Sequence, residues 1–419
     1  MNSPLAIIVG PPWVRCGSAR VIQNQIEYYH QRGYRTLFIA VAIERGFWRN
    51  SPSWDGFKEG MREYRADHLA IAALDRERYV ETKYVATIRH GLRGTALNWV
   101  VDIARSAQLL PGDVRLIRES AVALIHVNHV YTLDFARRLR RQWVRDGQRV
   151  PMIVETHDVQ SRVLQERGDL NPWTKRPDTL ERSVRSEKTL LKKADVLVHC
   201  SVDDMKFFQA LIPDKQHVLT LPAIDETFVS AMNGSSPPLA QTIDLLFVGA
   251  GHVANLAAVK WFFEHVWPRI ADRRYSLRIV GDIDRLVSRD LPQIYEAFRS
   301  CFVGRTADLA PYYRSARCVF APMVSGCGIS IKTIEALALG KPFVGTSKAF
   351  RGMPMDRIER TGLRAYDDPQ AFADAIVCTL GDEQIAGALS RAAYDLLLSM
   401  PAAFASRDDA IRIATGCRQ

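Results

Sequence analysis

Short apolar runs alternate with longer amphipathic segments along the chain. Residues 5–10 (LAIIVG), 121–129 (AVALIHVNH) and 243–248 (IDLLFV) are nearly continuous apolar runs, as expected of strands buried on both faces of a parallel sheet. The segment 17–32 instead repeats apolar positions every three or four residues and stops at Gly33, which predicts a helix. Its buried face comprises Val21, Ile22, Gln25, Ile26 and Tyr29. The alternation predicts an α/β protein made of successive βα units.

The length of the chain and one polar stretch predict two domains. At 419 residues the chain exceeds what a single core usually spans. Residues 230–242 (SAMNGSSPPLAQT) are rich in small and polar residues and proline, which predicts a linker. We expect one Rossmann-like domain over 1–229, a second over 243–395, and a terminal helix over 396–419. Residues 47–60 (FWRNSPSWDGFKEG) predict an inserted loop.

Composition narrows the classes of protein to consider. Hydrophobic residues make up 47% and charged residues 24% of the chain, which is ordinary for a globular protein. No stretch reaches 18 uninterrupted apolar residues, and the N-terminus has no secretory pattern, so we expect neither a spanning helix nor a signal peptide. The seven cysteines form no CxxC pair and no metal-ligand spacing. We therefore expect free thiols in a reducing cytosol and no metal site.

The chain is basic, with a net charge of +10 and a pI near 9.3. No RNA-binding aromatic signature or zinc-finger pattern accompanies this charge, so we expect no nucleic-acid partner. Two interpretations remain open: a solvated arginine-rich surface, or attraction to anionic lipid headgroups at the inner face of a membrane. The arginine cluster behind the second interpretation is Arg137, Arg138, Arg140, Arg141 and Arg145.

The stretch 325–346 (SGCGISIKTIEALALGKPFVGT) carries the clearest chemistry. A glycine-bearing loop leads to a helix that should begin near Ser330 and end at Gly340. A helix N-terminus behind such a loop attracts anions, because its free N–H groups and its dipole point at them. Lys332 and Glu335 share one helical face, so the lysine would strengthen a phosphate site and the glutamate would accept hydrogen bonds from sugar hydroxyls. The pattern suits a nucleotide-sugar.

This stretch closely resembles the donor site of the retaining family 4 glycosyltransferases, which have the GT-B fold. Members usually carry two glutamates eight positions apart, and the run that starts at Glu335 (EALA) matches the second; Cys327 stands where the first would be. Some relatives have a G-x-G-x-x-x-K run here, as this chain does. Weaker matches are the run at 156–162 (THDVQSR) and the FVG and NLAAVKWF runs within 247–262. The resemblance implies two Rossmann-like domains that face each other across a cleft, with the terminal helix packed back on the first.

The resemblance also implies which residues contact the donor. The second domain would bind the nucleotide-sugar, and the loop at Gly17 of the first domain would approach its phosphates. The other expected donor contacts are Gly249, Gly251, His252, Asn255, Gly281, Gly304, Arg305, Gly328, Ile329, Ser330 and Thr333. Many relatives carry a cation in the loop 249–252, which this chain lacks. Stabilisation of the diphosphate should therefore fall on Lys332.

The resemblance implies that catalysis needs charge stabilisation more than a strong base. It also implies retention of configuration and no metal ion. No cofactor is expected, since the nucleotide-sugar is a substrate. Lys332 would stabilise the departing diphosphate, and Glu335 would hold the ribose or the sugar. The side chain that faces the transferred sugar is left open among Asn128, His129 and His157. The neighbouring carboxylate, Asp158, could keep His157 cationic.

We therefore expect a hexosyltransferase that acts in cell-surface polysaccharide synthesis in the cytoplasm, and the second interpretation of the charge places it at the inner face of the membrane. The acceptor, a glycan, a lipid-linked glycan or a small molecule, would bind the first domain. Two alternatives stay open. The missing first glutamate and loop cation favour a non-catalytic GT-B scaffold or regulatory protein, and an epimerase of nucleotide-sugars would share the fold.

Overall fold

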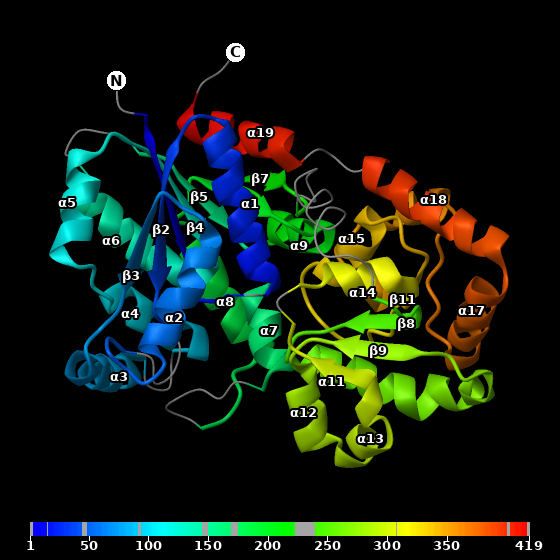
Figure 1. Cartoon of the computed structure of the whole chain (residues 1–419). Coiled ribbons are helices and arrows are strands. Elements are labelled where there is room, and N and C mark those ends of the chain that lie inside the picture. The colour runs from blue at the N-terminus through cyan, green and yellow to red at the C-terminus, as the bar shows by residue number, and fades with distance from the viewer. Residues whose placement is uncertain are drawn as a thin grey trace. The chain divides into compact units, whose positions relative to one another are not determined.

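The chain forms two compact units in a computed structural model (Figure 1). The first unit comprises Met1–Ala223 and Ala402–Gln419, and the second comprises Ile224–Pro401. The structure describes residues 3–14, 16–43, 48–90, 94–144, 150–168, 175–222, 239–306, 308–399 and 403–416. Most of the linker expected at 230–242, and Arg145 of the arginine cluster, lie outside these residues.

The described residues of the first unit form a seven-stranded parallel sheet in the order β3-β2-β1-β4-β5-β6-β7. The strands are β1 (Leu5–Gly10), β2 (Arg35–Val41), β3 (His68–Ala72), β4 (Val122–Asn128), β5 (Met152–Glu155), β6 (Val196–His199) and β7 (Gln216–Leu219). The helices are α1 (Gly17–Gln31), α2 (Trp54–Met61), α3 (Arg76–His90), α4 (Ala96–Ser106), α5 (Pro111–Glu119), α6 (Leu133–Trp143), α7 (Gln160–Glu166), α8 (Leu180–Leu191), α9 (Val202–Leu211) and α19 (Ala403–Thr415), with short 3-10 turns η1 (Arg62–Tyr64) and η2 (Val130–Thr132).

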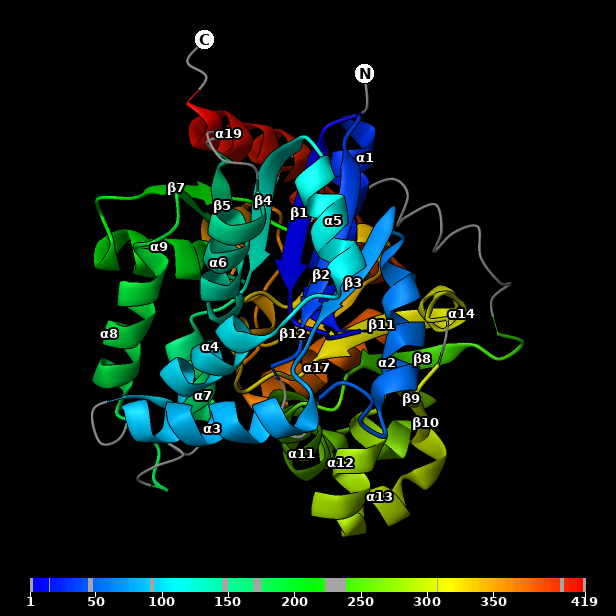
Figure 2. The same cartoon turned by 90° about the vertical axis from the view of Figure 1, so that its left-hand side faces the viewer.

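Both faces of this sheet are buried, as the apolar runs predict. Alternate residues of β1 enter two different cores: Leu5, Ile7 and Val9 face α4, α6, α8 and α9, whereas Ala6 and Ile8 face α1 and α2. Helix α19 returns from the far end of the chain and packs on β5, β6 and β7. Figures 1 and 2 show α19 beside α1 over the second of these faces.

The second unit is built around a smaller parallel sheet. Its described strands have the order β10-β9-β8-β11-β12. These strands are β8 (Ile243–Val248), β9 (Leu277–Val280), β10 (Phe302–Gly304), β11 (Ala316–Ala321) and β12 (Phe343–Gly345). The helices are α11 (Val253–Trp261), α12 (Ile283–Asp290), α13 (Pro292–Ala297), α14 (Ala310–Ser315), α15 (Ile331–Ala338), α16 (Met355–Arg360), α17 (Pro369–Gly381) and α18 (Glu383–Ser399), with a π turn η3 (Phe262–Val266) and 3-10 turns η4 (Trp267–Arg269), η5 (Ala271–Arg273), η6 (Arg299–Cys301) and η7 (Ser347–Phe350).

One local expectation is wrong. The stretch 47–60 was expected to be a loop, but its second half forms α2. Trp54, Phe57 and Met61 recur at helical spacing and enter apolar cores of the first unit, so burial outweighs the turn-forming residues around them. Within the described part of the chain, no helix is long and apolar enough to cross a membrane.

Candidate functional site

The first unit gathers polar side chains where β4 and β5 end. Asn128 is the last residue of β4 and pairs in register with Glu155, the last residue of β5. His129 and His157 follow these strands, so both lie at the edge where open parallel sheets bind ligands. Both histidines have positive φ, 65° for His129 and 60° for His157. Such a backbone costs free energy in a residue other than glycine, and strain of this kind clusters at functional sites.

The two histidines contact each other and the start of α1. Their rings stack with centroids 4.1 Å apart, and Trp13 meets the His129 ring edge-on at 4.9 Å. His129 Nε2 lies 3.1 Å from the Ser18 hydroxyl, next to Gly17. The structure thus brings together three elements that the sequence singled out: the loop at Gly17, His129 and His157.

The Asn128 side chain does not belong to the stack of His129 and His157 rings. Its side chain is fully buried and points into the unit, where its amide nitrogen donates to the Val9 carbonyl (3.3 Å) and to Gln25 Oε1 (2.9 Å). Its oxygen Oδ1 faces Gln25 Nε2 and His157 Nε2, each at 2.7 Å. Asn128 therefore acts on the site through His157. Which of the three residues faces a transferred sugar remains an expectation.

The expectation of a cationic His157 is wrong. Burial lowers the pKa of His157 to about 4, and Glu155 opposes this shift without overcoming it. Burial also lowers the pKa of His129 well below its usual value, and the neighbouring His157 adds to the effect. Removal from water disfavours the charged form of each ring more than nearby acids favour it. At neutral pH both histidines are neutral.

In the second unit, three glycine loops meet at the carboxyl ends of β8, β9 and β10. The N–H of Gly281 donates to the Gly304 carbonyl (2.8 Å), and a Cβ on Gly281 would lie 2.1 Å from the Gly249 carbonyl oxygen. Gly281 also has φ of 120°, so no larger residue fits. Arg305 follows the third loop and is exposed. The amides of Gly249 and Gly251 already donate, to the Val280 carbonyl and to Asp282 Oδ1.

Helix α15 carries Lys332 to this group of loops. The helix begins after Ser330 as predicted, and its first N–H groups have no acceptor one turn earlier in the helix. The Lys332 ammonium donates to Asn255 Oδ1, lies 3.5 Å from Met323 Sδ and sits 4.8 Å from the centre of the Phe247 ring. Asn255 in turn donates to the Ala250 carbonyl at 2.8 Å. Two predicted donor residues, Lys332 and Asn255, are therefore in direct contact.

Lys332 is not the only cation at this place. Burial lowers its pKa to about 7, repulsion from Arg351 adds to the effect, and Glu335 opposes it. The Arg351 guanidinium crosses the glycine loop: its Nε donates to the Cys327 carbonyl at 3.1 Å, and a Cβ on Gly326 would lie 3.2 Å from it. Arg351 is not predictable from the local pattern of the sequence, because it lies 24 residues beyond Cys327.

The remaining residues of the α15 segment divide into two kinds. Thr333 and Ser330 are buried and hydrogen-bond each other, and Thr333 also donates to the Ala349 carbonyl at 2.7 Å, so both support the loop. Glu335 accepts a hydrogen bond of 3.1 Å from the Tyr313 hydroxyl. Gly328 has φ of 64° and lets the chain turn into the helix, while Ile329 packs on the core. None of these contacts assigns a catalytic role.

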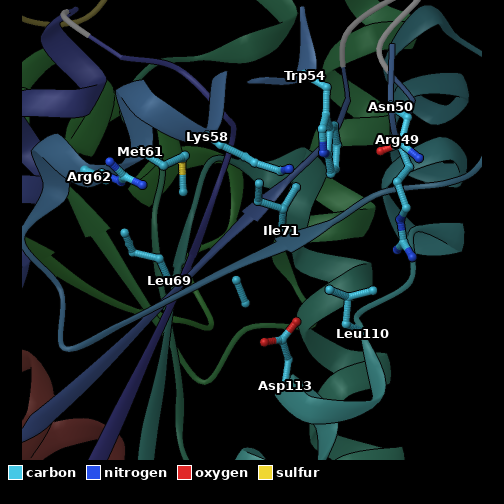
Figure 3. Close-up of a pocket in the computed structure, with 11 residues that line it drawn as sticks. Arg49, Asn50, Trp54, Lys58, Met61, Arg62, Leu69, Ile71, Leu110 and Asp113 are labelled. Carbon is cyan, nitrogen blue, oxygen red and sulfur yellow. The ribbon is translucent and has the colours of Figure 1, made fainter. Parts of the chain in front are cut away.

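A third candidate binding site is a cavity of about 440 Å³ in the first unit, at the edge strand β3 (Figure 3). Its floor is apolar, from Trp54, Leu69 and Ile71, and Lys58 extends over the Trp54 ring at 5.7 Å. Arg49 at its rim donates to the Gln108 carbonyl at 3.2 Å. Three strand spacings, about 14 Å, separate β3 from β4, so the cavity is distinct from the histidines.

In the described residues, no group of three His, Cys, Asp or Glu side chains is placed to hold a metal ion.

Comparisons with known proteins agree with this geometry. Residues 242–382, about a third of the chain, match the family model described as glycosyl transferases group 1. A search of curated proteins found no match. Among solved structures, HepE from Anabaena in complex with UDP is 13% identical, with a TM-score of 0.62 over 98% of this chain and 99% of that chain. Sucrose-phosphate synthase from Thermosynechococcus elongatus is 17% identical, with a TM-score of 0.63 over 99% and 100%. The α,α-trehalose 6-phosphate synthase from Burkholderia multivorans is 14% identical, with a TM-score of 0.61 over 99% of each chain.

These comparisons confirm the fold class and the resemblance to GT-B glycosyltransferases. The two parallel sheets, each in its own Rossmann-like unit, are those of the GT-B fold. The residues of the second unit that match the glycosyl transferases group 1 model include the three glycine loops and all of α15.

Proposed function

We propose that the protein is a glycosyltransferase that moves a sugar from a nucleotide-sugar donor to an acceptor. One observation carries the proposal: Lys332, at the start of α15, meets Asn255 and the glycine loops inside the matched family segment. A cation, a helix N-terminus and close-packed glycine backbone at the carboxyl edge of a parallel sheet suit a diphosphate. The donor would therefore bind the second unit, and the acceptor would bind the first.

The proposed chemistry is stabilisation of the leaving diphosphate. Negative charge grows on the phosphate oxygens as the sugar departs, and Lys332 with the α15 N–H groups would offset it. Arg351 adds positive charge at the same loop. Glu335, held by Tyr313, would accept hydrogen bonds from donor hydroxyl groups. Transfer with retention and without a metal ion is part of this proposal.

The relatives suggest which donor to test first. The HepE structures contain UDP, UDP with glucose, and UDP-glucose. We extend to this chain only the class, a hexose linked to a nucleoside diphosphate. The acceptor would be a glycan, a lipid-linked glycan or a small molecule, and a role in cell-surface polysaccharide synthesis belongs to the same proposal.

Titration calorimetry tests the donor site. UDP, GDP and ADP, and the matching sugars, would be titrated into the full chain and into Lys332→Met. For the nucleotide that binds, the substitution should weaken affinity at least about tenfold, the scale of one charge-assisted hydrogen bond. Affinity of the unmodified protein should also fall between pH 6.5 and 8.5, because Lys332 has a pKa of about 7 and binds an anion best when charged. That dependence should vanish in the variant.

Lys260 provides the matched control, since it is an exposed lysine of the same unit on α11. Lys260→Met should bind like the unmodified protein. Binding that is unaffected by Lys332→Met, or weakened equally by both substitutions, would overturn the proposed donor site.

Cys327 favours a second candidate function, a non-catalytic protein that binds a nucleotide-sugar. The position occupied by a glutamate in many family members has no carboxylate here, and its carbonyl is bonded to Arg351. Donor consumption followed by NMR separates the candidates: transfer to an added acceptor supports the enzyme, and binding without turnover supports the scaffold. Conversion of the donor to another sugar without an acceptor would indicate an epimerase.

A further inference from the structure

The C-terminal helix places a buried cation behind the histidines of the first unit. Arg407 of α19 is only 2% exposed, and its Nη2 lies 3.3 and 3.4 Å from the two carboxylate oxygens of Glu155, at the end of β5. The pair joins residues 252 positions apart. Arg407 Nε and Nη1 have no hydrogen-bond partner among the described residues. Glu155 therefore provides the anion that compensates this guanidinium.

Helix α19 is also held by contacts of its more exposed residues. Asp408, the next residue, accepts two hydrogen bonds from Arg32, at 2.6 and 3.0 Å, and one from the Tyr28 hydroxyl at 2.5 Å. Ala410 packs with the apolar residues of β5 and β6. These contacts hold the helix without Arg407, so the arginine is not needed merely to attach it.

A chain of hydrogen bonds leads from Arg407 to His157. Glu155 Oε2 accepts from Gln25 Nε2 at 2.7 Å, and the Gln25 amide pairs with the amide of Asn128. The Val9 carbonyl and the Glu155 carboxylate can only accept, so they fix the orientation of both amides. Asn128 Oδ1 must then accept from His157, which assigns the ring proton of neutral His157 to Nε2.

His126 is fixed by the same carboxylate. Its Nε2 lies 3.1 Å from Glu155 Oε2, and its Nδ1 lies 2.8 Å from the Tyr29 hydroxyl. A neutral ring satisfies both contacts when Nε2 donates and Nδ1 accepts. Burial lowers the pKa of His126, although Glu155 opposes the shift. With both rings neutral, Arg407 is the permanent cation beside Glu155.

We propose that Arg407 is a positioning residue for His157. By balancing the charge of Glu155 from the C-terminal helix, it adds to the burial that keeps His126 and His157 neutral, and it preserves the amide chain that aims the His157 ring. Without Arg407, Glu155 would take its compensating charge from a proton on His126. Nδ1 of His126 would then be a donor, Tyr29 could no longer donate to it, and the chain would rearrange. The proposal rests on the proposed function only for what His157 does to a substrate.

Other titratable groups surround this carboxylate. Tyr29 of α1 interacts with it, and Tyr29 in turn contacts the rings of Tyr28 and Tyr34. His199 and Cys200, at the end of β6, interact with Glu155, and burial is the main influence on both: it lowers the pKa of His199 to about 3 and raises that of Cys200 well above its usual range. None of these groups supplies a positive charge at neutral pH.

Histidine NMR tests the proposal without any substrate. The full chain would carry ¹³C,¹⁵N-histidine, with His126 and His157 assigned by single His→Gln substitutions. In the unmodified protein neither ring should titrate between pH 5.5 and 8, and His157 should show the Nε2–H tautomer. In Arg407→Met, His126 should titrate in that range, and the His157 signals should shift. Arg407→Lys should restore the original spectrum at least in part.

Two further variants keep the test decisive. Arg412→Met removes an exposed arginine of the same helix, paired with Asp409, and should leave both histidines unchanged. Glu155→Gln combined with Arg407→Met removes both charges, so His126 should again stay neutral. If Arg407→Met does not fold, the His126 titration in this double variant tests the proposal. Unchanged His126 and His157 titrations in folded Arg407→Met, or a double variant that is unfolded or still titrates, would overturn the proposal. Failure to bind a nucleotide-sugar would refute the proposed function and leave these spectra unaffected.

Discussion

At the scale of single residues, Lys332 occupies a place that favours its uncharged form. Burial lowers its pKa from 10.5 to about 7, and Arg351 adds to this shift. Between these values the folded protein binds fewer protons than the unfolded chain, so stability rises with pH across that range. The destabilisation by Lys332 is therefore complete below about pH 7 and fades toward pH 10.5. A phosphate beside the ammonium would favour the charged form, so the residue suits the bound protein better than the free one.

Replacing this lysine should stabilise the fold. At pH 6.5, Lys332→Met should raise the Tm by at least about 2 °C, which corresponds to roughly 1 kcal/mol for a unit of this size. The methionine would pack against Met323 and Phe247 and remove the cost of a buried charge. Scanning calorimetry from pH 6.5 to 10 should show the difference in Tm shrinking as the pH rises. A lower Tm at pH 6.5, or a difference that does not change with pH, would contradict this account.

Many residues of the histidine site in the first unit and of the Lys332 site in the second could be identified from the sequence, but the contacts between them could not. Lys332 could be singled out because it belongs to a local pattern of loop, helix and spacing, and Asn255 because the family resemblance implies it. Gln25 stood on an apolar helical face, and Glu155 ended an apolar strand, which signals buried partners in both cases. The partner of Glu155 is Arg407, 252 positions away on another element, and no local periodicity specifies such a pair.

At the scale of elements, one helix fixes the beginning of another beside His157. Glu187, on α8, accepts hydrogen bonds from the backbone N–H groups of Gln160 (2.8 Å) and Ser161 (3.0 Å), the first residues of α7. A carboxylate at a helix N-terminus satisfies N–H groups that the helix itself leaves unpaired. Burial raises the pKa of Glu187 to about 7 despite these bonds. The segment from His157 into α7 is thus held by a side chain 26 residues away.

Loss of this cap should loosen α7. Glu187→Ala should increase hydrogen exchange at least about fivefold in the peptide that covers 160–166, equivalent to roughly 1 kcal/mol of lost capping. Glu181→Ala is the matched control, because Glu181 lies on the same helix and is exposed in a pair with Arg185. Exchange mass spectrometry at constant pH measures both. Equal exchange in the two variants would show that Glu187 does not hold the start of α7.

Elements with strong periodicity were predictable, and those that depend on tertiary burial were not. The helix expected after Ser330 and the strand at 121–129 match α15 and β4 closely. Helix α2 was missed, because its glycines and polar neighbours favour a turn until Trp54 and Phe57 meet the core. The terminal segment was expected as a helix over 396–419 that Pro401 would kink or end, and in the structure α18 ends at Ser399 while a separate helix, α19, begins at Ala403.

At the scale of the whole molecule, the positive charge is partly neutralised within the fold. The described arginines of the cluster on α6 are largely engaged: Arg137 pairs with Asp134, Arg140 pairs with Asp195, and Arg138 lies over the Phe135 and Trp143 rings. Arg141 is exposed. The cluster by itself therefore offers less free charge than its sequence suggests, and attraction to an anionic surface would depend on the net charge of +10.

We propose peripheral association with anionic membranes, and salt-dependent binding to vesicles tests it. Vesicles of phosphatidylcholine with anionic phosphatidylglycerol should bind the protein at about 0.01 M salt, where the screening length is roughly 30 Å, and release it near 1 M, where it is roughly 3 Å. Each basic residue near the surface contributes about 1 kcal/mol, so Arg141→Gln, which removes the exposed arginine of the cluster, should weaken binding about fivefold. Arg289→Gln, an exposed arginine of the second unit, serves as the control. If anionic and neutral vesicles bind alike, or neither binds, the basic surface does not serve membrane association and a lipid-linked acceptor loses its support.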